Sequence, residues 1–190
     1  MMLQWLRKKV LDWSRPSSVE AELLYRQVAE TARTPQIYEQ YAIADTFDGR
    51  FDALCLVATL VVRRLTKMTE NTIGKQRAQE LIDTMFADMD LSLHEIGVSE
   101  NKVGKKVKVM ATAFMGRVKA YGAALDAGDK AMLISALERN VYRDTDDMGR
   151  AKQLANQVMR AASDLDHQND ADLLAGKISP QIDILDNGHA

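Results

Sequence analysis

The sequence predicts an all-α fold, a single-domain bundle of about seven to eight helices. Between positions 72 and 97 the apolar residues recur in steps of three and four, which places them on one face of a long helix. These residues are Leu81, Ile82, Met85, Phe86, Met89, Leu93 and Ile96. Only three prolines interrupt the 190 residues, and the apolar–polar alternation that is typical of strands is rare. A helix with so long a stripe must bury it against other helices, which the rest of the chain supplies.

Four helices are expected before this one, at about 3–13, 19–33, 35–41 and 50–68. A proline–serine break precedes the second. The third has Thr34 as its cap and Pro35 in its first turn, where a missing N–H costs nothing. The fourth is apolar almost all round, which indicates a central helix. Its last turns carry Arg63, Arg64 and Lys67, cations that the helix dipole favours at that end.

Three helices are expected after it, at about 103–125, 130–142 and 144–165. Gly97 can stop the long helix in the left-handed conformation, and Gly128-Asp129 separates the next two. No useful periodicity is found from Gly176 onward. The predicted organisation is therefore an N-terminal amphipathic helix and linker (1–16), one helical domain (17–175) and a loose C-terminal tail (176–190).

The N-terminal segment is basic and amphipathic and contains two tryptophans, a composition that suits an anionic membrane surface. The predicted membrane contacts are Leu3, Trp5, Leu6, Val10 and Trp13. The alternative is that this helix packs on the domain or frays. The most apolar stretch, 53–62, falls well short of the roughly 20 residues that cross a bilayer, and no secretory signal is expected.

Metal and enzyme chemistry find little support. Helical di-iron sites need paired Glu-x-x-His motifs, and none occurs. Asp144, Asp146 and Asp147 are a conceivable Mg²⁺ cluster, but acids at a helix start also cap its free N–H groups. Cys55 is the single cysteine, so no internal disulfide forms, which fits a reducing compartment. We therefore expect no enzyme activity, no metal and no cofactor, and the net charge of −2 gives no general attraction to DNA.

Two segments are candidate contact surfaces. Lysines at positions 102, 105, 106 and 108 sit at a helix start, where the dipole disfavours cations. They either keep the chain soluble or contact an acidic partner, ribosomal RNA or lipid headgroups. In segment 45–52, we expect Asp48 to cap a helix, Gly49 to turn the chain, and Phe47 and Phe51 to staple it to the core. Arg50 is expected to pair with a nearby carboxylate.

Several motifs in order resemble the ubiquinol–cytochrome c chaperone family. They are Asp-Thr-Phe-Asp-Gly-Arg-Phe-Asp at 45–52, Phe-Ala-Asp-Met-Asp-Leu-Ser-Leu-His-Glu-Ile-Gly-Val at 86–98, Val-Gly-Lys-Lys-Val-Lys at 103–108, Phe-Met-Gly-Arg-Val-Lys-Ala-Tyr at 114–121, and Asn-Val-Tyr at 140–142. The resemblance covers roughly 38–165. His94 and Met115 depart from the basic and aromatic residues expected at those positions.

The resemblance implies an all-helical, non-enzymatic assembly factor for respiratory complex III that binds newly made cytochrome b. It also implies a small partner protein and the ribosomal tunnel exit as further partners. We expect a bacterial member that works in the cytoplasm at the inner membrane. The alternatives are a generic helical adaptor with another client and, less favoured, a Mg²⁺-dependent helical enzyme.

A chaperone of this kind needs an apolar or methionine-rich surface, because methionine side chains adapt to variable partners. Methionines at 85, 89, 110, 115 and 132 are candidates for such a groove, or they are ordinary core residues. The predicted partner-binding residues are Lys105, Lys106, Lys108, Asp45, Arg50, Met85, Met89, Met115, Arg117 and Tyr121.

Overall fold

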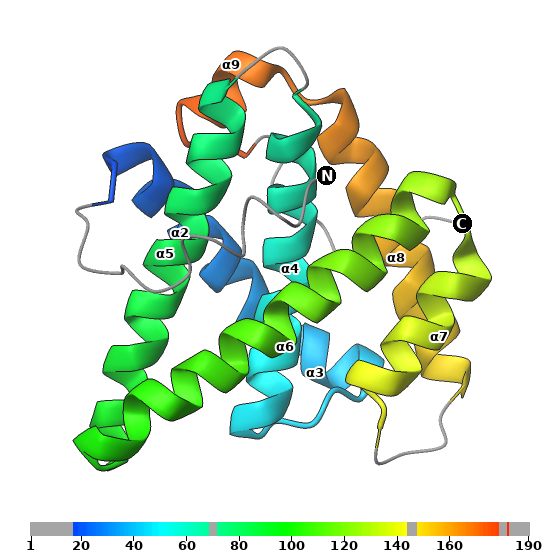
Figure 1. The fold of residues 1–190 in the computed structure, drawn as a ribbon. Coiled ribbons are helices and arrows are strands. Elements are labelled where there is room, and N and C mark those ends of the chain that lie inside the picture. The colour runs from blue at the N-terminus through cyan, green and yellow to red at the C-terminus, as the bar shows by residue number, and fades with distance from the viewer. Residues whose placement is uncertain (1–16, 69–71, 144–147, 179–181, 183–190) are drawn as a thin grey trace.

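The computed structural model describes residues 17–68, 72–143, 148–178 and 182, and these residues form eight helices and no strand. The all-α prediction is confirmed (Figure 1). The helices are α2 (Val19–Ala32), α3 (Pro35–Tyr41), α4 (Phe47–Lys67), α5 (Thr72–Glu95), α6 (Glu100–Ala127), α7 (Lys130–Asn140), α8 (Met148–His167) and α9 (Asp170–Leu174).

Two sets of predicted residues lie outside the described residues. They are the proposed membrane contacts Leu3, Trp5, Leu6, Val10 and Trp13, and the acids Asp144, Asp146 and Asp147. Within the described part of the chain, no helix is both long enough and apolar enough to cross a bilayer.

Helix α4 is the centre of the bundle, as its uniformly apolar sequence predicts. Every residue from Phe51 to Thr66 is buried, and α4 contacts α2, α5, α6 and α8. Figure 1 shows the long α6 lying diagonally across the front of α4. A helix that is apolar on all sides stays buried only when it is surrounded in this way.

Helices α5 and α6 form a hairpin that buries most of the apolar stripe predicted for α5. Phe86 of α5 meets Phe114 of α6 edge to face, with 5.8 Å between ring centroids. Gly97 takes φ of +81° directly after the helix, as expected for a glycine stop. Ile96 was expected inside the stripe, and that prediction is wrong: α5 ends at Glu95, and the Ile96 side chain is 61% exposed.

Arg63 and Arg64, near the end of α4, form hydrogen bonds to residues of three other helices. The Arg63 guanidinium donates to Asp126 of α6 at 2.7 Å and to both carboxylate oxygens of Asp166 on α8 at 3.0 Å. Arg64 donates to the main-chain oxygen of Leu165 and to Asp170, at the start of α9. A buried guanidinium is tolerated when its N–H donors all find acceptors. These arginines therefore stabilise contacts between helices more than they interact with the dipole of α4.

Part of the segment after α9 packs on the bundle. Ile178 and Ile182 are buried. The Gln27 side chain donates to the Gly176 main-chain oxygen at 2.8 Å and accepts from the Ile178 N–H at 3.0 Å. Neither this contact nor α9 was expected from the sequence, since isolated isoleucines carry no periodicity.

Candidate partner-binding groove

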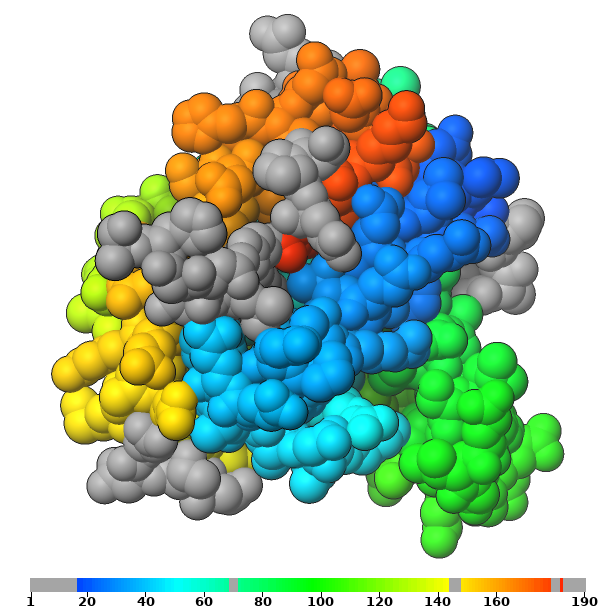
Figure 2. All heavy atoms as spheres, turned by 180° about the vertical axis from the view of Figure 1, so that it is seen from behind, coloured from blue at the N-terminus to red at the C-terminus, as the bar shows by residue number. Residues whose placement is uncertain are grey.

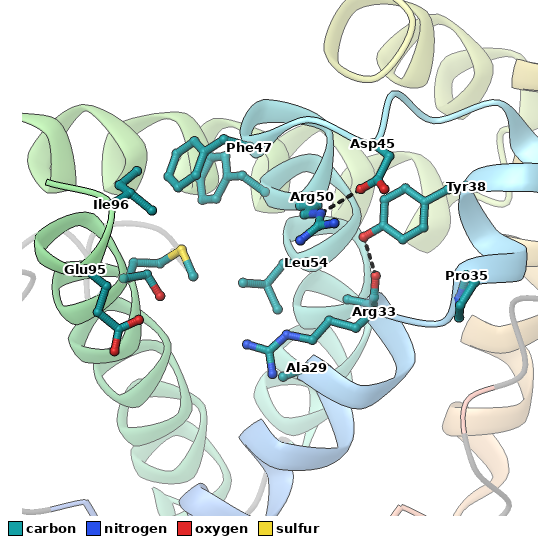
Figure 3. Close-up of a pocket in the computed structure, with 14 residues that line it drawn as sticks. Ala29, Arg33, Pro35, Tyr38, Asp45, Phe47, Arg50, Leu54, Glu95 and Ile96 are labelled. Carbon is teal, nitrogen blue, oxygen red and sulfur yellow. Dashed lines mark hydrogen bonds and ion pairs between the residues drawn. The ribbon is translucent and has the colours of Figure 1, made fainter. Parts of the chain in front are cut away.

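A groove of about 450 Å³ opens where the end of α2, the start of α3, the first turns of α4 and the end of α5 meet (Figure 3). We call it the Phe47 groove. Its buried floor is apolar and consists of Ala29, Ala32, Phe51, Leu54 and Met89. A concave apolar surface with a few polar groups at its edge is the usual form of a binding site.

Two large apolar side chains stand exposed at one edge of the groove. Phe47, in the first turn of α4, is 40% exposed, and Ile96, just beyond α5, is 61% exposed. Figure 3 shows them at the same edge of the groove, on different elements. Exposed apolar side chains next to an apolar hollow are typical of a surface that a partner covers.

Several polar side chains line the opposite edge, and Glu95 lies beside Ile96. The Arg50 guanidinium donates to Asp45 at 2.6 Å, and this hydrogen bond lowers the pKa of the Asp45 carboxyl. The Tyr38 hydroxyl donates to the Ala32 main-chain oxygen at 2.6 Å, and partial burial raises its pKa. Arg33 is exposed, with its guanidinium 3.7 Å from Asp88. These groups can bind the main chain or polar ends of an apolar segment seated on the floor.

A tight turn before α4 positions Phe47 and Arg50. Thr46, not Asp48, is the cap, and its hydroxyl accepts from the Gly49 N–H at 3.2 Å. The predicted capping role of Asp48 is therefore wrong. Gly49 is needed for close approach, because a Cβ there would lie 1.8 Å from the Ala44 main-chain oxygen. Only a residue without a side chain allows the chain to return so closely on itself.

A buried ionic cluster lies beneath this turn. Asp52 is only 2% exposed; it accepts from the Arg117 guanidinium of α6 and lies 3.1 Å from that of Arg143, which follows α7. Burial raises the pKa of the Asp52 carboxyl more than the two arginines lower it. The Arg117 guanidinium also lies 5.5 Å from the centre of the Phe51 ring, in a cation–π contact. The groove floor is thereby tied to α6.

The sequence profile described as Ubiquinol-cytochrome C chaperone matches residues 39–181. The chain belongs to the ubiquinol–cytochrome c chaperone family. A solved relative, "Crystal structure of the Cbp3 homolog from Brucella abortus", is 36% identical, with a TM-score of 0.78 over 97% of this chain and 98% of that one. A search of the curated proteins gave no match. The resemblance inferred from the motifs is confirmed.

In this family member, the structure brings three of the predicted partner-binding residues together. Asp45, Arg50 and Met89 all line the Phe47 groove. Asp45 and Arg50 form the ion pair that the sequence suggested. Lys105, Lys106 and Lys108 lie elsewhere, exposed on the outer side of α6.

The remaining predicted residues lie in the interior or away from the groove. Met85, Arg117 and Tyr121 are buried, Met115 is half-buried, and burial raises the pKa of the Tyr121 hydroxyl. Their contact with a partner stays a prediction, and in this conformation they act through packing. Of the other methionines, 110 is buried and 132 is exposed on α7.

Sequence reasoning missed Phe47, Ile96, Tyr38 and Arg33 as groove residues. Ile96 was assigned to the core by its helical spacing. Phe47 was expected to staple the helix start to the core, but its side chain is 40% exposed. The signal that separates them is their position at a helix end, where the chain leaves the core.

The described residues contain no group of three or more potential metal ligands. Cys55 is fully buried, and burial raises the pKa of its thiol. The site can therefore bind a partner through apolar contact with its floor and through the charged side chains at its edge.

Proposed function

We propose that this chain is a non-enzymatic chaperone that holds newly made cytochrome b while ubiquinol–cytochrome c reductase is assembled. Membership of the ubiquinol–cytochrome c chaperone family supports ubiquinol–cytochrome c reductase as the complex whose assembly is assisted. The single observation that carries the proposal is the Phe47 groove, with its apolar floor and two exposed apolar side chains. A membrane protein in the course of synthesis exposes apolar helices that need such a surface.

The size of the groove suits a few side chains and not a whole helix. Amphipathic or apolar helices commonly dock through side chains spaced three or four residues apart. Fully burying one Leu, Ile or Phe side chain contributes about 1.5–3 kcal/mol, so two or three supply on the order of 5 kcal/mol before the cost of association. Binding of this strength is reversible, which a chaperone that releases its client requires.

The charged edge gives the groove a preferred orientation of client. Arg33 and Arg50 are exposed beside the apolar floor, where they can meet the polar end of a client helix or its carbonyl groups. We place the chaperone at the inner membrane, where the client is inserted, with the ribosome and a small partner protein as further contacts.

Deleting the gene and measuring assembled complex III tests the proposal. We expect the assembled complex to fall, and complementation by wild-type protein to restore it. The double variant Phe47→Ser with Ile96→Ser should restore it poorly, because it removes the two exposed apolar side chains from the edge of the groove. Met132→Ser is the matched control, since Met132 is 42% exposed on α7, away from the groove.

Unchanged complex III after deletion would contradict the proposed function. Full complementation by the Phe47/Ile96 variant would contradict only the role of the groove. If tagged protein recovered solely water-soluble partners unrelated to complex III, the chain would instead be a general helical adaptor.

A further inference from the structure

The outer face of α6 carries positive charge over much of the length of the helix. No acidic residue occurs between positions 101 and 125, whereas five lysines do, at 102, 105, 106, 108 and 119. All five are exposed. Among the residues that the structure describes, none of them lies within ion-pair distance of a carboxylate.

These lysines share one side of the helix, opposite the side that packs on α4. At 100° per residue they fall within an arc of about 160°, and the buried residues Val103, Val107, Phe114 and Val118 fall outside it. We call this arc the lysine face. From Lys102 to Lys119 it extends roughly 25 Å along the axis. Val109 lies near its middle and is 62% exposed, among the most exposed large apolar side chains described.

The lysine face lies on a free side of the molecule. Figure 1 shows α6 across the front of the bundle, and Figure 2, from behind, shows the α5–α6 corner projecting from the body. The five lysines and Val109 are exposed along this length of α6. Lys102 also stands in the first turn of α6, where the helix dipole disfavours a cation, so local stability does not account for its position.

We propose that the lysine face is a docking surface for an anionic phospholipid membrane. Lysines that flank an exposed apolar side chain suit headgroup phosphates on either side of a shallow apolar contact. RNA fits less well, because its recognition draws on arginine and on aromatic stacking. The lysine face has neither: Arg117 is buried against Asp52, and Phe114 and Tyr121 point into the core.

The inference deepens the proposed function, since it rests on a client that is a membrane protein. It places α6 against the bilayer surface, while the Phe47 groove is lined by residues of α2 to α5 and the turns beside them. The whole chain has a net charge of −2, so attraction to an anionic surface must come from a local face of this kind and fall off within a Debye length.

The test uses the full chain and vesicle flotation, with phosphatidylglycerol mixed into phosphatidylcholine. Each lysine near an anionic surface is worth about fivefold in binding. The double variant Lys105→Gln with Lys108→Gln should therefore bind roughly 25-fold more weakly. The control, Lys75→Gln with Lys152→Gln, makes the same change of charge at exposed positions on α5 and α8 and should bind as wild type does.

A third variant, Val109→Ser, separates membrane from nucleic acid. It should weaken vesicle binding severalfold and leave binding to poly(U) RNA unchanged. The inference is overturned if the Lys105/Lys108 variant floats as well as wild type, which would assign any vesicle binding to another segment. It is also overturned if wild type binds pure phosphatidylcholine equally well, or binds poly(U) more tightly than vesicles. Because no cytochrome b is present, failure here leaves the groove and the complex III test unaffected.

Discussion

Replacing Gly49 with alanine tests how the wall of the Phe47 groove is built. Gly49 lies in the first turn of α4, and a Cβ there would lie 1.8 Å from the Ala44 main-chain oxygen and 2.9 Å from its carbonyl carbon. These are backbone atoms that cannot rotate away, so either the turn at 44–46 or the start of α4 must move. Overpacking of this kind costs about 1–3 kcal/mol, and we expect the upper half of that range.

Gly116→Ala is the matched control. Gly116 lies in the interior of α6, and a Cβ there would meet nothing within 4 Å. Alanine is a better helix former than glycine, so this variant should be more stable than wild type by about 0.5–1 kcal/mol. The same chemical change should thus have opposite effects at the two positions.

Urea unfolding followed by far-UV circular dichroism measures both free energies. In a chain of this size, each kcal/mol moves Tm by roughly 2–4 °C, so thermal unfolding gives an independent value. Equal stability of the Gly49→Ala and Gly116→Ala variants would refute the steric reasoning. If Gly49→Ala also binds an apolar client helix more weakly, the turn positions Phe47 and Arg50.

Two further predictions concern buried charge. Asp52→Ala removes the whole side chain that accepts from the buried Arg117 guanidinium and should reduce the free energy of unfolding by about 3–5 kcal/mol; a loss near zero in urea unfolding would contradict this. Partial burial raises the pKa of Asp166, but the hydrogen bond and charge of Arg63 outweigh it, so the folded pKa lies below the ordinary 3.8. The stabilisation by ionised Asp166 is therefore present above pH 3.8 and is lost as pH falls through the folded pKa. The stability difference between wild type and Asp166→Asn should shrink on acidification. A difference independent of pH would contradict the lowered pKa of Asp166 in the folded state.

The helices could be predicted because each carries a regular spacing and a stop signal. The stripe of α5 is buried from Leu81 to Leu93, and Gly97 adopts the left-handed conformation that its position suggested. What spacing cannot show is where a helix ends within one turn. That is why Ile96, at the right interval for the core, is instead exposed at the groove.

The groove could be predicted only in part. The resemblance drew attention to Asp45 and Arg50, and both line it. The local sequence suggested Asp48 as the cap, but the structure uses Thr46, because the approach of Gly49 to Ala44 decides the geometry of the turn. The long-range ion pairs of Arg63 with α6 and α8 depend on tertiary packing, which a single sequence read locally does not contain.

Site-specific photo-crosslinking to newly made cytochrome b tests the central claim most directly. A photoreactive side chain at Phe47 should capture cytochrome b during synthesis, because Phe47 stands exposed at the edge of the apolar groove. The same group at Met132, which is equally exposed but lies on α7, should not. Equal capture at both positions, or capture at Met132 alone, would contradict the account of the Phe47 groove as the client site.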